Sequence, residues 1–290
     1  MRFISIMLFL MVALVTTPKD ARSLSNPDVS LSSEEMARGD VILITIKADE
    51  GETPRVTWMG KEISLVFNSG NTSWQGFIAA DLNQKAGAYK AVVRMSSSGF
   101  EKPINIQVIN KDYGVRNLTL PKEKVELDAE TLKRVNKETA VVNALWSARE
   151  SSPEWKGIFL MPVDGEVIGD FGKRSMINNM ERSPHTGVDL RANAGDPVKA
   201  VNNGKAVLVA DHFFTGNSLF LDHGGGIISM YFHFDKILVK DGDTVEKGQI
   251  IGLAGATGRA TGPHLHWGMR VNGARVNPLT LIDLSKGLEE

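Results

Sequence analysis

Hydrophobic positions over residues 41–109 lie in short segments rich in β-branched or aromatic residues, which is the pattern of β-strands. Turn residues such as Asn68-Ser69-Gly70 separate these segments. The predicted strands are Val41–Ala48, Arg55–Trp58, Ile63–Phe67, Trp74–Ala79, Ala88–Met95 and Ile104–Ile109. Six short strands at this spacing predict a small antiparallel β-sandwich (Ig-like) over residues 35–112. This region contains no histidine, and we assign it no catalytic role.

A helical pattern replaces the strand-like segments within residues 113–156, and Asp128 stands where the N-cap of a helix belongs. Residues of one helical stripe follow at steps of three and four: Leu132, Val135, Thr139, Val142 and Trp146. The stripe predicts a linker helix that packs on a neighbouring domain. A second interpretation is a prosegment that blocks an active site.

Strand-like segments return after residue 157, where most of the 28 glycines also lie. The predicted strands are Val198–Val201, Ala206–Ala210, Ser218–Leu221, Ile227–Phe232 and Ile250–Ala254. They predict a second all-β domain over residues 157–284, followed by a short tail over residues 285–290. The expected fold class is therefore all-β, with one helical linker between two β domains.

The first residues predict export. Arg2 precedes an apolar run, Phe3–Val15, which is too short to span a bilayer and matches the h-region of a signal peptide. We predict a signal peptide over residues 1–22 and a flexible, Ser-rich lead-in over residues 23–34. The protein is expected in the periplasm or cell envelope, or anchored to the membrane if the apolar segment is retained.

Charge and cysteine content exclude several classes of protein. The 33 basic and 34 acidic residues give a net charge of −1, which offers no argument for nucleic-acid binding. The chain has no cysteine, so it has neither disulfides nor thiolate nucleophiles. A metal ion must therefore be held by histidine and carboxylate.

All six histidines follow residue 157, and two stretches have spacings that suit a metal site. His185-Thr-Gly-Val-Asp189 places two polar side chains on one face of a strand, and Gly187 between them leaves room for an ion. His264-Leu265-His266 follows the same rule, with Leu265 facing the core. Two such pairs on adjacent strands can converge on one point.

With His233 in the apolar stretch 230–234, the sequence offers five candidate groups for a zinc site: His185, Asp189, His233, His264 and His266. A catalytic zinc uses three protein ligands and one water. The other two imidazoles suit proton transfer near neutral pH. The spacing predicts metal-assisted hydrolysis without deciding which three residues bind the metal.

In these residues the chain resembles the lysostaphin-type (LytM-like) zinc metallopeptidases, from about Met161 to Pro278. The stretches that carry the resemblance are Phe171-Gly172, HTGVDL (185–190), GDPVKAVNNGKAV (195–207), LDHGGGIISMYFHF (221–234), GDTVEKGQIIGLAGATGRATGPHLHW (242–267) and Asn277-Pro278. The resemblance implies a glycine-rich, mostly antiparallel two-sheet β fold with an active-site groove.

The resemblance also implies roles for the five residues. His185, Asp189 and His266 correspond to zinc ligands, and His264 to the general base. His233 corresponds to a second catalytic histidine that stabilises the oxyanion, although either histidine suits either role. The implied reaction is the hydrolysis of cross-links or stem peptides of bacterial peptidoglycan by a zinc-activated water.

Other polar and aromatic residues of this domain receive structural interpretations. His212 and His223 are expected to be structural histidines. Tyr231 shares a strand face with His233 if alternation is regular, so we expect it to border the site. Trp267 alternates with His266 and is expected in the core.

Two other functions are alternatives to peptide hydrolysis. One is a metal-free LytM-like module that binds and activates other cell-wall hydrolases, but such relatives lack the ligand residues. The other is a biotinyl or lipoyl carrier domain around residues 241–252, which would need a modifiable lysine on a tight hairpin.

The N-terminal sandwich is expected to bind wall polymer, dock an envelope protein or restrict access to the groove. We expect a monomer, and an isolated 157–290 fragment at least as active as the mature protein.

Overall fold

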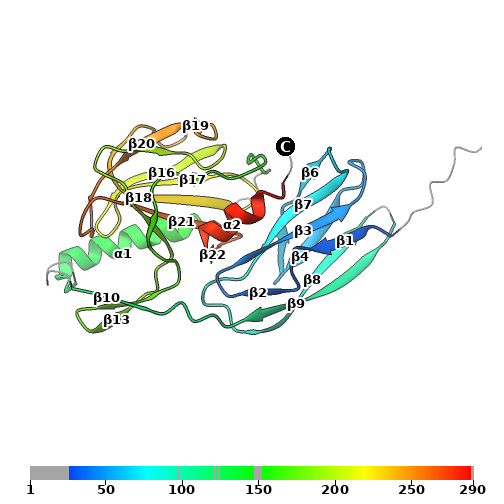
Figure 1. The fold of residues 1–290 in the computed structure, drawn as a ribbon, viewed down its shortest axis with the longest axis horizontal. Helices are drawn as coiled ribbons and strands as arrows, with labels where there is room; N and C mark the ends of the chain where they lie inside the picture. Colours follow the sequence, from blue (N-terminus) through cyan, green and yellow to red (C-terminus); the bar gives the residue numbers. More distant parts are fainter. Residues whose placement is uncertain (1–25, 97, 120–121, 123–124, 147–151, 289–290) are drawn as a thin grey trace, which may run out of the picture.

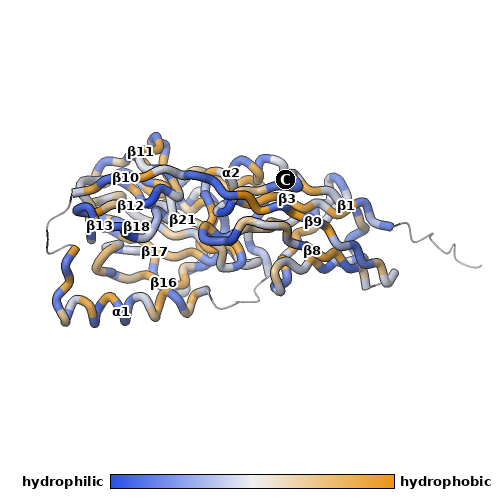
Figure 2. The backbone as a smooth tube through the Cα atoms, turned by 90° about the horizontal axis from the view of Figure 1, so that it is seen from below, coloured by the Kyte–Doolittle hydropathy of each residue, from blue (hydrophilic) through white to orange (hydrophobic). Residues whose placement is uncertain are grey.

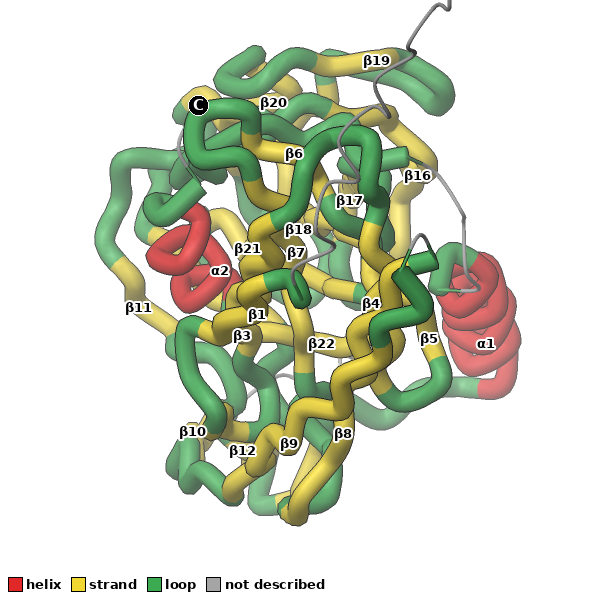
Figure 3. Tube along the Cα trace, turned by 90° about the vertical axis from the view of Figure 1, so that its right-hand side faces the viewer, coloured by secondary structure: helices red, strands yellow, loops and turns green. Residues whose placement is uncertain are grey.

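The computed structural model describes residues 26–96, 98–119, 122, 125–146 and 152–288 (Figure 1). Over these residues the chain is almost entirely β, with two α-helices that lie on different sides of the molecule (Figure 3). The predicted all-β class is confirmed. Neither described helix is long and apolar enough to cross a membrane. The predicted signal peptide over residues 1–22 lies outside the described residues.

The N-terminal part contains two sheets that pack against each other. The first has the order β1 (Asp28–Leu31), β3 (Val41–Lys47), β7 (Ser73–Ala79) and β6 (Val66–Asn68). The second has the order β2 (Glu35–Ala37), β9 (Glu101–Ile109), β8 (Gly87–Met95), β4 (Pro54–Trp58) and β5 (Lys61–Ile63). Ile44 and Ile46 from the first sheet share one buried cluster with Val93 and Ile106 from the second. Alternate residues of each strand therefore supply a common core.

Two predictions for this part are wrong. The flexible lead-in over residues 23–34 contains strand β1, which pairs antiparallel with β3 and packs Val29 and Leu31 against the core. The single predicted strand Ile63–Phe67 is two strands, since β5 pairs with β4 in one sheet and β6 pairs with β7 in the other. The chain changes sheets between them, at residues 64–65.

The linker forms a strand and the predicted helix. Helix α1 (Ala129–Ala144) begins after Asp128, whose Oδ1 accepts a hydrogen bond from the Thr131 amide at 2.7 Å. Strand β10 (Val115–Leu118), which the sequence analysis did not predict, pairs parallel with β12 (Arg174–Ile177). Strand β13 (Met180–Arg182) completes this small sheet.

The C-terminal part is a ten-stranded sheet in which every pairing is antiparallel. Its main path is β11 (Val167–Gly169), β14 (Gly187–Leu190), β21 (Leu265–Val271), β18 (Ile227–Ile237), β17 (Gly216–Asp222), β16 (Gly204–His212) and β19 (Thr244–Val245). Strands β15 (Pro197–Lys199) and β20 (Ile250–Ala254) branch from β18, and β22 (Ala274–Val276) pairs with β21.

Strand β18 connects the two layers of this part. Its residues 227–232 pair with β21, whereas residues 234–237 pair with β20. Val198 and Ile251 from the branch share a buried cluster with Tyr231 and Trp267 from the main sheet. The core therefore lies between the main sheet and its branch, and the opposite face of β18 and β21 is left for other contacts.

The N-terminal and C-terminal parts pack on each other. Helix α2 (Pro278–Ser285), drawn in red in Figure 1, lies at their junction, and Phe77 and Leu82 join the cluster that contains Leu281. The predicted tail over residues 285–290 is wrong for its described residues, because Ser285 and Leu288 are buried. Ser285 Oγ accepts a hydrogen bond from the Phe159 amide at 3.0 Å.

Candidate metal centre

Strands β14 and β21 bring the two motifs together. Asp189 and His266 are direct register partners across these strands, and His185 lies just before β14. A Cβ atom at Gly187 would stand 2.4 Å from the Trp267 carbonyl oxygen and 2.7 Å from His266 Nε2. Glycine thus permits the close approach of the two strands. The sequence predicts room for an ion beside Gly187, but the His266 ring occupies this space.

Three side-chain atoms converge at this place. His185 Nε2 lies 2.9 Å from Asp189 Oδ1 and 3.0 Å from His266 Nδ1, and the last two atoms are 2.8 Å apart. His185 is buried, whereas Asp189 and His266 are partly exposed. A group with this composition and spacing can hold a metal ion.

The hydrogen bond at Nδ1 of His185 directs the lone pair of its Nε2 toward the place where a metal ion would bind. Its Nδ1 lies 2.8 Å from the Asp170 carbonyl oxygen, which can only accept, so Nδ1 carries the hydrogen. In the neutral ring Nε2 then holds a lone pair and faces the carboxylate of Asp189, another acceptor. Two acceptors 2.9 Å apart require a proton or a metal ion between them. Two imidazoles and a carboxylate, without cysteine, are a donor set that suits Zn²⁺.

Charge at the cluster also favours a metal. Burial would raise the pKa of Asp189, but hydrogen bonds with His185 and His266 outweigh burial and hold that pKa well below its usual range. Burial lowers the pKa of His266. The carboxylate is therefore ionised and His266 neutral near pH 7, which are the forms that bind a metal ion.

His233 and His264 form a second pair beside the first cluster. Their ring centroids are 4.8 Å apart, and His264 Nε2 lies 3.9 Å from Asp189 Oδ1. The Nδ1 atoms donate to the carbonyl oxygens of Thr257 and Gly262, each at 2.8 Å, so in the neutral form of either ring the lone pair is on Nε2. Burial, with a contribution from nearby His266, lowers the pKa of His233 to about 4. The structure thus brings all five predicted residues into one site.

The backbone at His233 explains why the prediction for Tyr231 is wrong. His233 has a φ of 66°, an uncommon conformation for a residue other than glycine, and the register of β18 shifts around it. Alternation is broken there, so His233 reaches the site although Tyr231 faces the core. Tyr231 is fully buried, and its hydroxyl accepts a hydrogen bond from the Val201 amide at 3.1 Å. Trp267, its register partner, is fully buried as predicted.

Two further residues at the site, Phe232 and Arg116, were not predicted from the sequence. Phe232 stacks on His266, with 5.2 Å between ring centroids and 2° between planes. It is the register partner of His266, a relation that only the pairing of β18 with β21 reveals. Arg116 comes from the linker strand β10, and its Nη1 lies 3.3 Å from Asp189 Oδ2. No local pattern marks it, since 73 residues separate it from Asp189.

The remaining histidines have structural surroundings. His223 is fully buried, donates from Nδ1 to the Asn203 carbonyl at 2.7 Å, and has Ser229 Oγ 2.7 Å from Nε2. His212 is buried and its ring meets Phe220 edge-on. Both environments agree with the structural interpretation from the sequence.

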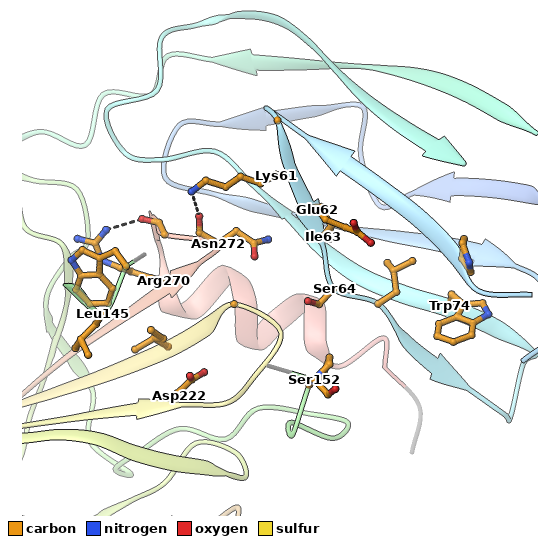
Figure 4. Close-up of a pocket in the computed structure, with 18 of the residues that line it drawn as sticks. Lys61, Glu62, Ile63, Ser64, Trp74, Leu145, Ser152, Asp222, Arg270 and Asn272 are labelled. Carbon is orange, nitrogen blue, oxygen red and sulfur yellow. Dashed lines mark hydrogen bonds between the residues drawn. The ribbon is translucent and has the colours of Figure 1, made fainter. Parts of the chain in front are cut away.

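A cavity of about 860 Å³ lies elsewhere, at the junction of the two parts (Figure 4). Lys61 and Trp74 line it from the N-terminal part, and Arg270 and Asn272 line it from the C-terminal part. Lys61 Nζ donates to the Asn272 carbonyl at 2.7 Å. None of the five candidate residues lines this cavity. The metal centre therefore lies outside it.

Comparisons with known proteins agree with this site. The sequence profile of peptidase family M23 matches residues 183–278, which include all five residues. The peptidoglycan DD-endopeptidase ShyA of Vibrio cholerae is 40% identical over 121 residues, which are 41% of this chain and 28% of that protein. The DD-carboxypeptidase/endopeptidase Mpg of Neisseria meningitidis is 38% identical over 97 residues, 33% of this chain and 22% of that protein. The chain thus matches less than a third of the length of these curated relatives.

A solved structure matches over a much greater length. It is a crystal structure described as an M23 peptidase of Pseudomonas aeruginosa, with 33% sequence identity and a TM-score of 0.68. The match covers 86% of this chain and 95% of that one, so it includes the N-terminal part as well as the metal centre. With this similarity, and with the five residues gathered at one site, the chain belongs to peptidase family M23.

Proposed function

We propose that this protein is a zinc-dependent endopeptidase that hydrolyses peptide cross-links of bacterial peptidoglycan. The observation that carries the proposal is the convergence of His185 Nε2, His266 Nδ1 and Asp189 Oδ1, three potential ligand atoms that lie close enough together to bind one metal ion. The names of the Vibrio cholerae and Neisseria meningitidis relatives support peptidoglycan as substrate and favour DD-linked bonds. The apolar run Phe3–Val15 supports export to the compartment that holds this polymer.

His185, Asp189 and His266 would hold the zinc ion. When bound, zinc supplies Lewis-acid polarisation of a peptide carbonyl and lowers the pKa of water to about 7, which makes a nucleophile available at neutral pH. The Nδ1 hydrogen bond from His185 to Asp170 fixes the tautomer that leaves Nε2 free for the metal.

His264 and His233 would move the protons of the reaction. In our proposal His264 Nε2 accepts a proton from the attacking water and later returns it to the leaving amine. His233 would stabilise the negative charge that develops on the carbonyl oxygen. Both rings are held through Nδ1 and carry the same lone pair on Nε2, so the division of roles rests on the family resemblance.

The experiment is a digestion of purified peptidoglycans that differ in their cross-links, with products identified by mass. We expect the purified protein to contain one zinc ion and to convert cross-linked muropeptide dimers to monomers. A chelator should abolish cleavage, and added zinc should restore it. His185→Ala should lose both zinc and activity, whereas His212→Gln, which changes a histidine outside the site, should keep both.

Two results would count against the proposal. Protein without stoichiometric zinc would exclude the metal centre. Zinc-loaded protein that cleaves none of the peptidoglycans would instead favour a module that only binds the wall or activates other hydrolases.

A further inference from the structure

Arg116 contacts the oxygen of Asp189 that does not face the histidines. Its Nη1 lies 3.3 Å from Oδ2, whereas Oδ1 lies within 3 Å of both His185 Nε2 and His266 Nδ1. The two oxygens of one carboxylate thus face different partners. Arg116 lies in the linker strand β10, whereas the five residues of the candidate metal centre all lie in the C-terminal part.

The position of Arg116 is itself fixed by strand pairing and a side-chain bond. Arg116 and Ser175 are register partners in the parallel pairing of β10 with β12. Arg116 Nε donates to Ser175 Oγ at 2.8 Å. The Arg174 amide donates to the Gly114 carbonyl at 3.0 Å and extends the pairing before β10. Backbone and side chain therefore both hold the guanidinium against Asp189.

The segment that carries Arg116 is also tied to the N-terminal part. The Tyr113 hydroxyl donates to the Arg38 carbonyl at 2.7 Å, and the Tyr113 ring meets Phe171 edge-on at 5.6 Å. A Cβ atom at Gly172 would stand 2.3 Å from that ring, so glycine permits the contact. Residues 113–118 thus connect the N-terminal sheets, strand β12 and the metal centre.

We infer that Arg116 is a positioning residue that orients Asp189 for the metal ion, so that metal affinity depends on the linker strand. The inference rests on the proposed zinc site. The Asp189 side chain is only 17% exposed, and without Arg116 its Oδ2 would lose an ion-pair partner in a largely enclosed place. Loss of a partner that holds a metal ligand typically weakens metal binding by about 10–100-fold.

The positive charge of Arg116 acts in the opposite direction, since it repels a bound dication. In our inference orientation outweighs this repulsion, because the planar guanidinium joins Ser175 at Nε to Asp189 at Nη1 and so fixes where the carboxylate lies. Lysine in its place keeps the charge but lacks the planar guanidinium that joins Ser175 to Asp189. Arg116→Lys therefore separates the two effects.

The test measures zinc affinity of the full chain by competition with a chromophoric chelator, and the visible absorption spectrum of the Co²⁺-loaded protein. We expect Arg116→Ala to weaken zinc binding by about 10–100-fold and to alter the Co²⁺ spectrum. Arg116→Lys should also bind zinc more weakly, and Ser175→Ala, which frees the guanidinium, should weaken binding less. Arg94→Ala is the matched control, because Arg94 pairs with Glu101 on an exposed surface of the N-terminal part.

Thermal unfolding of each metal-free variant shows whether it is folded. If Arg116→Ala does not fold, Arg116→Lys and Ser175→Ala still decide the result. Zinc affinities equal to that of the original chain in all three variants would overturn the inference. Tighter zinc binding in Arg116→Ala would also overturn the inference, because Arg116 would then mainly repel the metal ion. Faster cleavage at unchanged zinc affinity would overturn it as well, because Arg116 would then block the site. If the original chain binds no zinc, the proposed function fails and the inference fails with it.

Discussion

Gly187 shows how one residue shapes the metal centre. Alanine at this position would place a Cβ atom 2.4 Å from the Trp267 carbonyl oxygen and 2.7 Å from His266 Nε2. Because β14 and β21 are paired there, the strands must separate or the His266 ring must turn. We expect Gly187→Ala to lower the free energy of unfolding by about 1–3 kcal/mol, as overpacked cores do, and to weaken zinc binding.

Gly51→Ala provides the control for this substitution, because a Cβ atom at Gly51 would meet no atom within 4 Å. Urea unfolding and chelator competition on both variants make the comparison. A Gly187→Ala variant that matches Gly51→Ala in stability and zinc affinity would show that the close approach is not required.

His223 predicts how stability depends on pH. Full burial lowers its pKa from 6.5 to about 4 in the folded chain. Between these values the unfolded chain binds a proton that the folded chain does not, so stability falls as pH falls through this range. The full contribution of His223 is present above pH 6.5, and a shift of this size corresponds to a loss of about 3 kcal/mol by pH 4.

The slope of stability against pH isolates this contribution. We expect the free energy of unfolding to decrease less steeply between pH 6.5 and pH 4 in His223→Gln than in the original chain. Parallel slopes would mean that His223 is protonated in the folded protein as easily as in the unfolded one.

Among the elements, those with a local signal were predictable. The Asp128 cap and the stripe after it predicted α1, and even spacing placed Asp189 and His266 on neighbouring strands. Strands β1 and β10 have only four residues each, and a pattern this short does not distinguish a strand from a loop. Their partners are distant in the sequence, and β10 pairs in parallel with β12, which is 59 residues away at Arg116 and Ser175.

The unpredicted strand changes one expectation about a fragment. From the sequence we predict that a 157–290 fragment is at least as active as the mature protein. The structure places Arg116 of β10 against Asp189, so such a fragment would lack a contact of the metal centre. Full activity of the fragment no longer follows from the fold.

Helix α1 lies beside β16 (Figure 2), where Arg134 forms an ion pair with Asp211 at 3.3 Å. The residue that follows the helix, Leu145, is buried against Ile228 and Met230 of β18. Strand alternation places these two on the same face as Phe232, which stacks on His266. The end of the helix therefore packs on the face of the sheet that carries the metal centre.

Leu145→Ala tests whether this packing stabilises the fold or blocks the site. We expect a loss of about 2–4 kcal/mol in the free energy of unfolding, because the substitution leaves a cavity against β18. Leu132→Ala, at an exposed position of the same helix, should change stability by less than about 0.5 kcal/mol. Cleavage rates under native conditions should be equal in both variants. A higher rate in Leu145→Ala would instead support a blocking prosegment.

At the scale of the whole molecule, the two parts share buried surface. Phe77 and Leu82 of the N-terminal part lie in one cluster with Phe159 and Leu281 of the C-terminal part. Unfolding of either part alone would expose apolar side chains of the other to water. We therefore expect calorimetry to show a single unfolding transition for the full chain.

The ion pair of Asp81 with Arg275 tests this coupling. Arg275 Nε and backbone N each lie 2.9 Å from Asp81 Oδ2, and the Arg275 side chain is only 20% exposed. Asp81→Ala would leave this guanidinium without its carboxylate, which should cost about 2–3 kcal/mol. Glu101→Ala, which breaks the exposed pair with Arg94, should cost less than about 1 kcal/mol. Because the parts are coupled, Asp81→Ala should move the whole transition to lower temperature. Two separate transitions, with the zinc-stabilised one unmoved, would show that the parts unfold independently.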